Sequence, residues 1–224
     1  MGYLSIYSNI YVFHQLRIDE MTRFIVATNN LGKIAELYAT LGNLHVELSR
    51  PMDIGLQLSV EESGQTYADN AKLKALAAVQ ASGLISLADD SGLEVDALGG
   101  APGVHSARYA GIGASDAARR AKLLEALRPF PAPRPARFRC ALAVAVPPRP
   151  SRPQGELRIF EGVCEGEIIF EERGHNGFGY DPIFYLDSYQ RTMAELPAEM
   201  KNQISHRARA ARAAWPYLQS LLTD

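Results

Sequence analysis

Two adjacent aspartates, Asp89 and Asp90, follow the apolar run GLISLA at residues 83–88. The run is short, partly β-branched and bounded by Gly83, which predicts a buried strand. Neighbouring residues of a strand point to opposite faces, and neighbouring carboxylates repel each other, so at least one of them must meet a cation or water. Because unpaired carboxylates are costly beside an apolar run, the pair is a candidate site for a divalent metal.

Two glutamates, Glu61 and Glu62, could add hard oxygen ligands to the same metal. Mg²⁺ prefers one or two carboxylates together with phosphate oxygens and water. Taken alone, these glutamates favour a solvated acidic loop, and one aspartate of the pair could instead cap the next turn. His105 and His175 lack the spacing of zinc ligands, so neither is expected to bind zinc.

The segment TNNLGK, residues 28–33, places polar side chains and a glycine where a helix is predicted to begin. Free backbone N–H groups, the helix dipole and Lys33 could together hold a phosphate. The GxxxxGK[ST] spacing of a Walker A loop is missing, and the segment alone is also typical of a plain capped turn. Asn70 and Lys74 lie four residues apart on a predicted helix, so they share a face and can point at a common ligand.

Two further segments carry groups suited to a ring with carbonyl oxygens. RGHNGFGYDPIFY, residues 173–185, packs glycines around Phe178 and Tyr180, which could form a loop that stacks on a base. Its glycines and proline could instead mark only a turn. MKNQISHR, residues 200–207, supplies donors for carbonyl or phosphate oxygens, although alone it could be merely a basic helix start; these donors are Lys201, His206 and Arg207.

Hydrophobic periodicity predicts the elements that position these groups. Strands are predicted at residues 23–27, 83–88, 136–146 and 155–170, and helices at 33–42, between Thr66 and Gly83, at 115–127 and at 206–222. Thr66 and Asp69 have the spacing of a capping box, and Ser115 is the expected cap of the third helix. The Pro-rich residues 147–154 are predicted to form a hairpin loop, and Pro216 to kink the last helix.

This order of elements predicts an α/β fold with a mixed central β-sheet flanked by helices. Open sheets of this kind bind ligands beyond the carboxyl ends of their strands. Since residues 28–33 and the segment DDSG, residues 89–92, both follow a strand, they are expected on the same rim. The chain is therefore predicted to place its phosphate-binding and acidic groups side by side.

The composition is that of an ordinary globular protein: 224 residues, 21% charged and 47% hydrophobic, with a net charge of -2. This charge gives no electrostatic case for binding nucleic acid, so local basic groups must hold an anionic ligand. Cys140 and Cys164 lie in separate predicted strands and are expected to stay reduced, which fits a cytoplasmic protein.

The first twenty residues lack the basic region, long apolar block and cleavage site of a signal or membrane span. Met21 directly precedes the first predicted strand. We therefore expect residues 1–20 to be a dispensable extension and residues 21–224 to form a single catalytic domain.

Five segments taken together resemble the inosine/xanthosine triphosphate pyrophosphatases: FIVATNNLGK, EESGQTYADNAKLKA, LADDSGLEVDALGGAPGVHSARYAG, GHNGFGYDPIF and KNQISHRARA. The resemblance runs from about Met21 to the last helix. It implies an elongated fold with a substrate cleft, of the shape shared with Maf-like proteins. It also implies Mg²⁺-dependent hydrolysis of non-canonical purine nucleoside triphosphates (ITP, dITP and XTP) to the monophosphate and pyrophosphate, by a homodimer.

Carried over by position, the resemblance makes Asp90 the catalytic carboxylate, which binds Mg²⁺ and activates a water for attack on the α-phosphorus. The predicted metal ligands are Glu61, Glu62, Asp89 and Asp90, and the predicted substrate contacts are Thr28, Asn29, Asn30, Leu31, Gly32, Lys33, Asn70, Lys74, Ser91, Phe178, Gly179, Tyr180, Asp181, Lys201, His206 and Arg207. SARYAG, residues 106–111, would lie near the dimer contact.

Two departures from the family pattern are mild: Asn29 stands where a glycine is common, and the Pro-rich hairpin loop belongs to no family motif. Two alternative functions remain open. One is a Maf-type nucleotide pyrophosphatase, which shares the fold but prefers other bases. The other is a nucleotide-binding module without catalytic activity. The segments SHR and GFGYDP argue against the first rival, and the retained carboxylates argue against the second.

Overall fold

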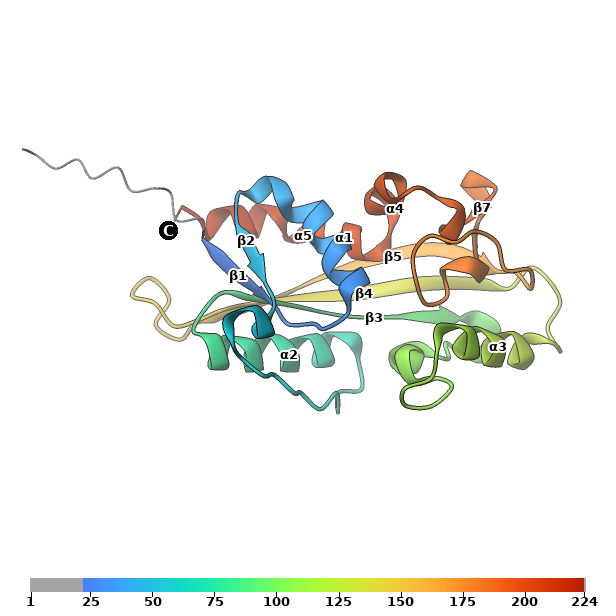
Figure 1. Ribbon diagram of the computed structural model, residues 1–224, viewed down its shortest axis with the longest axis horizontal. Helices are drawn as coiled ribbons and strands as arrows, with labels where there is room; N and C mark the ends of the chain where they lie inside the picture. Colours follow the sequence, from blue (N-terminus) through green and yellow to red (C-terminus); the bar gives the residue numbers. More distant parts are fainter. Residues whose placement is uncertain (1–21, 224) are drawn as a thin grey trace, which may run out of the picture.

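A mixed β-sheet runs the length of the molecule (Figure 1). The computed structural model describes residues 22–223, so the predicted extension, residues 1–20, lies outside the described residues. Within them seven strands pair in the order β2-β1-β3-β4-β5-β6-β7; they are β1 (Arg23–Val26), β2 (Glu47–Ser49), β3 (Ser86–Val95), β4 (Pro135–Val146), β5 (Glu156–Ile168), β6 (Phe184–Leu186) and β7 (Arg191–Thr192). The β2-β1-β3 pairs are parallel and all later pairs are antiparallel, which confirms the predicted mixed sheet.

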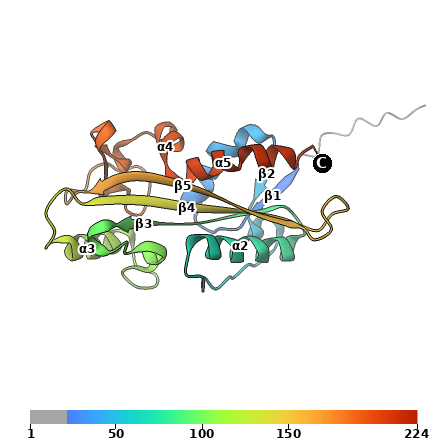
Figure 2. The same ribbon diagram turned by 180° about the vertical axis from the view of Figure 1, so that it is seen from behind.

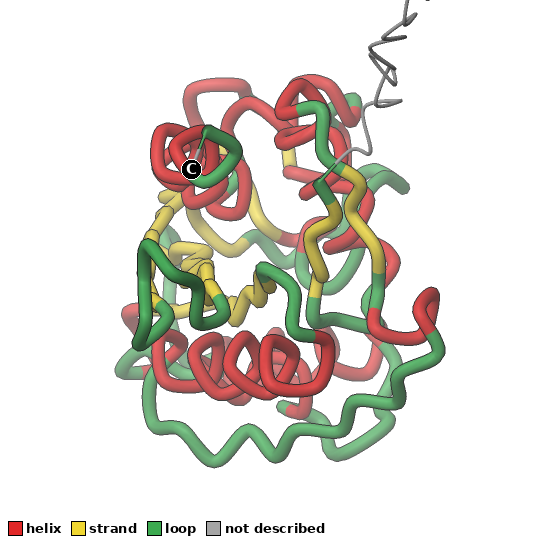
Figure 3. Tube along the Cα trace, turned by 90° about the vertical axis from the view of Figure 1, so that its left-hand side faces the viewer, coloured by secondary structure: helices red, strands yellow, loops and turns green. Residues whose placement is uncertain are grey.

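Helices cover both faces of this sheet, as the end-on view shows (Figure 3). Among residues 22–223 there are five α-helices: α1 (Leu31–Leu41), α2 (Tyr67–Ser82), α3 (Asp116–Leu127), α4 (Ala198–Ile204) and α5 (His206–Ser220). The front and back views agree that α2 and α3 lie on one face and α1, α4 and α5 on the other (Figure 2). Each helix in this part of the chain is too short or too polar to cross a bilayer.

The predicted caps set the helix ends. The Thr66 hydroxyl accepts a hydrogen bond from Asp69 N at the start of α2, and Gly83 ends that helix in the left-handed conformation. Ser115 caps α3 in the same way, as predicted. α1 begins at Leu31, two residues earlier than predicted, because the Asn30 side chain accepts a hydrogen bond from Lys33 N and so caps the helix.

β3 is longer than its sequence pattern indicates. The predicted strand ends at residue 88, but β3 continues through the two aspartates to Val95. The reason is its antiparallel neighbour β4, which pairs with β3 along its whole length, including Asp90 opposite Ala141. β1, in contrast, last pairs with β3 at Val26 and Leu87, so residues 28–33 begin beside the aspartates, as the shared rim predicted.

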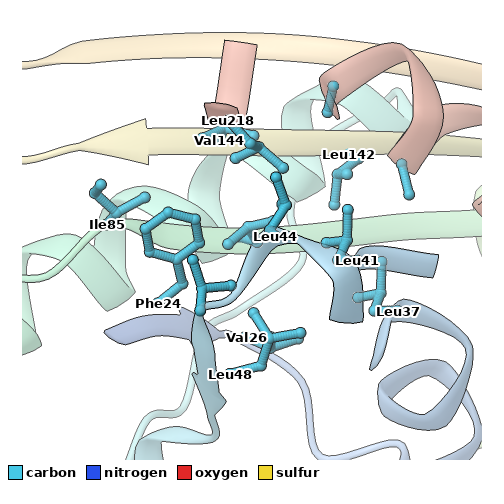
Figure 4. Close-up of a cluster of buried hydrophobic side chains, with 14 of the residues drawn as sticks. Phe24, Val26, Leu37, Leu41, Leu44, Leu48, Ile85, Leu142, Val144 and Leu218 are labelled. Carbon is cyan, nitrogen blue, oxygen red and sulfur yellow. The ribbon is translucent and has the colours of Figure 1, made fainter. Parts of the chain in front are cut away.

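Two apolar layers fix the helices on the sheet. On one face α1 and α5 bury Leu37, Leu41 and Leu218 against Phe24 and Val144 (Figure 4). On the other face α2 packs alanines onto alanines of the strands, namely Ala71, Ala75 and Ala78 on Ala88, Ala141 and Ala143. Because alanine side chains are small, α2 lies close to the sheet and brings its polar groups near Asp90.

Candidate active site

Asp89 and Asp90 point to opposite faces of the sheet, and each meets cations, as the strand geometry predicted. Asp89 Oδ2 lies 3.0 Å from Lys33 Nζ and 3.0 Å from Arg207 Nε. On the α2 face, Asp90 Oδ1 lies 3.1 Å from Lys74 Nζ. Asn70 shares this face, as its spacing from Lys74 predicted, and its Nδ2 donates to Asp90 Oδ2 over 3.3 Å. Alternation along β3 thus separates two charges that would otherwise repel each other.

The surroundings shift the pKa values of the two carboxyls in opposite directions. Burial raises the pKa of Asp89, but the nearby Lys33 and Arg207 charges outweigh it and hold that pKa far below the usual range. Burial also raises the pKa of Asp90, and there it outweighs Lys74, so the pKa stays above its ordinary value of 3.8. Asp89 is therefore a permanent anion, whereas Asp90 is the better proton acceptor.

The structure brings together two of the four predicted metal ligands. Lys74 Nζ contacts Glu62 Oε1 at 2.8 Å as well as Asp90, so these two carboxylates converge on one cation. Glu61 is exposed and lines neither of the two cavities described below. Asp89 points to the other face of the sheet, where it forms ion pairs with Lys33 and Arg207. No cluster of three or more His, Cys, Asp or Glu residues suited to a metal occurs in residues 22–223. Two convergent carboxylates fit a metal that takes its other ligands from phosphate and water.

The segment at residues 28–33 forms one side of an open cavity of about 670 Å³. The residues of this segment that line the cavity are Thr28, Asn29, Asn30 and Lys33. Lys74 and Glu62 line it as well. α1 begins directly after Asn30, which lines the cavity, and helix starts favour phosphate groups. Leu31 and Gly32 line neither cavity, and Leu31 is 68% exposed.

A second cavity, of about 200 Å³, adjoins the first, and Asn30, Lys33 and Glu62 line both. Residues 90–93 of β3 line it, together with residues 178–181 of the predicted ring-binding loop. The Phe178 ring lies so close to Gly32 that a Cβ added there would stand 2.6 Å from its Cδ1. Lys201 Nζ lies 4.8 Å from the centre of the same ring. We call this second cavity the ring-side pocket.

Glu36 forms ion pairs with two basic residues that line the ring-side pocket. Its Oε1 lies 2.8 Å from Lys201 Nζ, and its Oε2 accepts a hydrogen bond from Arg207 Nη1. Burial opposes its charge, but Arg207 and Lys201 together hold the pKa of Glu36 below its usual value. Sequence reasoning missed Glu36, although it lies three residues after Lys33 and hence on the same helix face.

The other residues predicted to contact the ring form hydrogen bonds in the ring-side pocket. Asp181 Oδ2 accepts hydrogen bonds from Lys201 Nζ over 2.5 Å and from Phe178 N over 2.9 Å. Ser91 Oγ accepts a hydrogen bond from Arg207 Nη2 over 2.9 Å. Tyr180 is buried, and its hydroxyl donates to Ser106 O over 2.9 Å.

His206 lines the ring-side pocket as a buried, neutral side chain. Its ring stacks on Phe138 with centroids 4.9 Å apart, and its Nδ1 has no hydrogen-bond partner among the described residues. Burial, reinforced by the charges of Arg207 and Lys201, lowers the pKa of His206 well below 6.5. The uncharged imidazole leaves Lys201 and Arg207 as the charged groups of the predicted donor set.

Two residues of α3, Asp116 and Arg119, also line the ring-side pocket, and sequence reasoning missed them. An acidic residue directly after a helix cap is ordinary, so Asp116 carries no local signal of function. Only the tertiary packing of α3 beside residues 178–181 reveals these residues as part of the site.

A mixed sheet with helices on both faces, and a cleft that joins a cavity lined by lysines to one lined by aromatic rings, are the features of an α/β protein suited to a phosphorylated ligand with a ring. Residues 24–217 match the Ham1 family, and the chain belongs to that family. This membership confirms both the fold class and the family resemblance that the five segments indicated.

Relatives cover nearly the whole chain. A dITP/XTP pyrophosphatase of Desulforamulus reducens is 48% identical over 200 residues, which are 89% of this chain and 96% of that protein. One of Geobacillus kaustophilus is 50% identical over 191 residues, covering 85% and 91%. Among solved structures, a HAM1 protein from Coxiella burnetii superposes with a TM-score of 0.76 at 44% identity, covering 91% of this chain and 99% of that one.

Proposed function

We propose that this chain is a nucleoside triphosphate pyrophosphatase that hydrolyses dITP, XTP and ITP to the monophosphate and pyrophosphate. It thereby removes non-canonical purines from the nucleotide pool. The observation that carries this proposal is the continuity of the ring-side pocket with the larger cavity: Asp90 lines the pocket, and its Oδ1 lies 3.1 Å from Nζ of Lys74, which lines the larger cavity. The relatives named dITP/XTP pyrophosphatase, at 48% and 50% identity, support the same activity.

The charged groups of the ring-side pocket select the base. Arg207 uses three of its five N–H groups on Asp89, Glu36 and Ser91, and its remaining donors are available to a ligand. Hypoxanthine and xanthine carry a 6-oxo acceptor for such donors, whereas adenine presents an amino donor. Because a site built around such a hydrogen bond discriminates by roughly 10⁴ or more, ATP is expected to be a very poor substrate.

Asp90 is the group that activates water. Its raised pKa suits it to accept a proton from the water that attacks the α-phosphorus. Lys33 and Lys74, which face the cavity from α1 and α2, offset the charge that develops on the phosphate oxygens. Asp89 keeps Lys33 and Arg207 in place as a fixed anion. No Ser or Cys nucleophile is required.

Glu62 and Asp90 are the residues that would hold Mg²⁺, since their carboxylates converge on one cation position. When bound, the ion would neutralise triphosphate charge and make water more acidic. We further propose that the protein acts in the cytoplasm as a homodimer, with residues 106–111 near the contact, and that it does not bind nucleic acid. The net charge of -2 supports the last point.

The test measures pyrophosphate release from ITP, XTP, dITP, GTP and ATP with Mg²⁺, alongside binding of ITP. Release from the first three only is the expected result. GTP shares the 6-oxo group, so its rejection must come from its 2-amino group, which would meet the wall at residues 178–181. Asp90→Asn should abolish release while keeping the fold and much of the ITP affinity, because only the charge and basicity of one carboxyl change. Glu161→Gln, an exposed residue of β5, serves as the control and should be fully active.

Each rival has its own outcome. Binding of ITP without any release of pyrophosphate would identify a non-catalytic module, and a preference for other bases would indicate a Maf-type enzyme. Near-normal turnover by Asp90→Asn would exclude Asp90 as the catalytic carboxylate.

A further inference from the structure

Side chains of α3 connect the two walls of the ring-side pocket. One wall is residues 178–181, and the other is the segment Gly103–Arg108. From the first wall, Gly179 N donates to Asp116 Oδ2 over 2.7 Å. From the second, Ala107 O accepts from Arg119 Nη1 over 2.6 Å. Asp116 and Arg119 are themselves an ion pair one helical turn apart, so the two walls are linked through a single turn of α3.

Three further hydrogen bonds complete this link. Arg120 Nη1 donates to Gly179 O over 2.9 Å, so α3 holds both the N–H and the C=O side of Gly179. Tyr180, the next residue, reaches across the pocket to Ser106 O. Ser106 in turn is fixed on β3, because its Oγ accepts a hydrogen bond from Leu93 N over 2.8 Å.

The frame that holds Asp116 is rigid. Leu123 and Leu127 of α3 are fully buried in a core cluster with Leu93 and Phe138. Ser115 caps the helix directly before Asp116, and a carboxylate in the first helical turn is favoured by the helix dipole. Gly179, in contrast, adopts a left-handed φ of 64° and has no neighbour within 4 Å of where a Cβ would stand. Its position therefore depends on these hydrogen bonds rather than on packing.

We infer that Asp116 is a positioning residue for base binding: through the Gly179 peptide and Arg119, it keeps the ring-side pocket preformed in the free protein. The part of this inference that concerns base binding rests on the proposed function. The part that concerns the positioning of the pocket walls by Asp116 does not. Asp116 itself does not line the larger cavity, which Lys33 and Lys74 face, although Ala107, to which Arg119 donates, lines both cavities. The loss of Asp116 should therefore weaken the hold on the base more than the hold on the phosphate groups.

The experiment compares Asp116→Ala, Asp116→Asn and Glu125→Ala. Glu125 is the matched control, because this residue of α3 forms an exposed ion pair at the same spacing with Arg128, the residue that follows the helix. For Asp116→Ala we expect the KM for XTP to rise about tenfold, which is the low end for losing a hydrogen bond to a charged group, with kcat nearly unchanged. Asp116→Asn keeps an acceptor for Gly179 N and should lie between this variant and the wild type.

Two readouts separate positioning from general damage to the fold. The inhibition constant of inorganic tripolyphosphate, which has no ring, should rise less than the KM for XTP does in Asp116→Ala, and it should stay unchanged in Glu125→Ala. Amide hydrogen exchange of residues 174–181 in the nucleotide-free protein should accelerate in Asp116→Ala and not in Glu125→Ala.

Unchanged exchange in residues 174–181 would overturn the inference, whatever the substrate proves to be. An equal loss of affinity for XTP and tripolyphosphate would also overturn it, since that pattern means a merely structural role. If the wild type hydrolysed none of these nucleotides, the proposed function would fail, while the exchange result would still decide the role of Asp116.

Discussion

Arg207 is the side chain on which most of the site's charge balance depends. It is 2% exposed and pairs with both Asp89 and Glu36. Removing one partner from a buried ion pair leaves an uncompensated charge, and here two carboxylates would lose the same cation. We therefore expect Arg207→Ala to lower the free energy of unfolding by about 3–5 kcal/mol, measured by urea denaturation. A loss below about 1 kcal/mol, typical of a surface pair, would contradict this account.

Because Arg207→Ala disturbs the fold, Arg207→Lys is the better test of base reading. Lysine keeps the positive charge but lacks the planar fork that serves Asp89, Glu36 and a ligand together. We expect the ratio of kcat/KM for ITP over ATP to fall at least tenfold, the usual effect of one hydrogen bond to a charged group. If the ratio stayed at the wild-type value, Arg207 would serve phosphate binding or structure only.

His206 makes stability depend on pH. The folded protein keeps this imidazole neutral well below pH 6.5, whereas the unfolded chain takes up a proton near that value. Between the two pKa values the unfolded state binds more protons, so stability falls as the pH drops through that window. We expect the free energy of unfolding to fall less between about pH 7 and pH 5 in His206→Asn than in the wild type.

At the scale of elements, the start of α1 and the ring-binding loop depend on each other at Gly32. A Cβ there would meet the Phe178 ring at 2.6 Å, so Gly32→Ala must push the ring out of place. Such overpacking costs about 1–3 kcal/mol, and we expect it to appear as weaker substrate binding, measured as a raised KM for XTP. Gly42→Ala is the matched control, because Gly42 has a φ of -57° and open space around it. Equal KM values for the two variants would show that the contact does not matter.

The elements also show how far local sequence patterns reach. The helix at residues 67–82 follows from its cap and its Gly83 stop, both of which are local signals. The length of β3 does not, because its hydrogen bonds come from β4, about fifty residues later, and the charged residues hide the strand pattern. The same holds for the site: residues 28–33 carried a visible signal, whereas Glu36 and Asp116 look like ordinary helix residues until the fold brings them beside Arg207 and Gly179.

At the scale of the molecule, the strands of residues 22–223 form one continuous sheet, and the family match begins at residue 24. Residues 1–20 precede both. We expect a chain starting at Met21 to keep its kcat/KM for XTP and its oligomeric state, measured by an activity assay and by light scattering. A large loss of activity or of soluble protein on truncation would show that the first twenty residues take part in the fold.

β3 carries Asp90 and, three residues later, Leu93 in the lining of the ring-side pocket. A strand rises about 3.3 Å per residue and stretches very little, so the backbone of β3 fixes how far Asp90 lies from the pocket wall at Leu93. Under the proposed function, we expect this fixed spacing to select the length of the substrate. A nucleotide whose linker between base and α-phosphorus is longer or shorter than a pentose should then bind less well at one of its two ends.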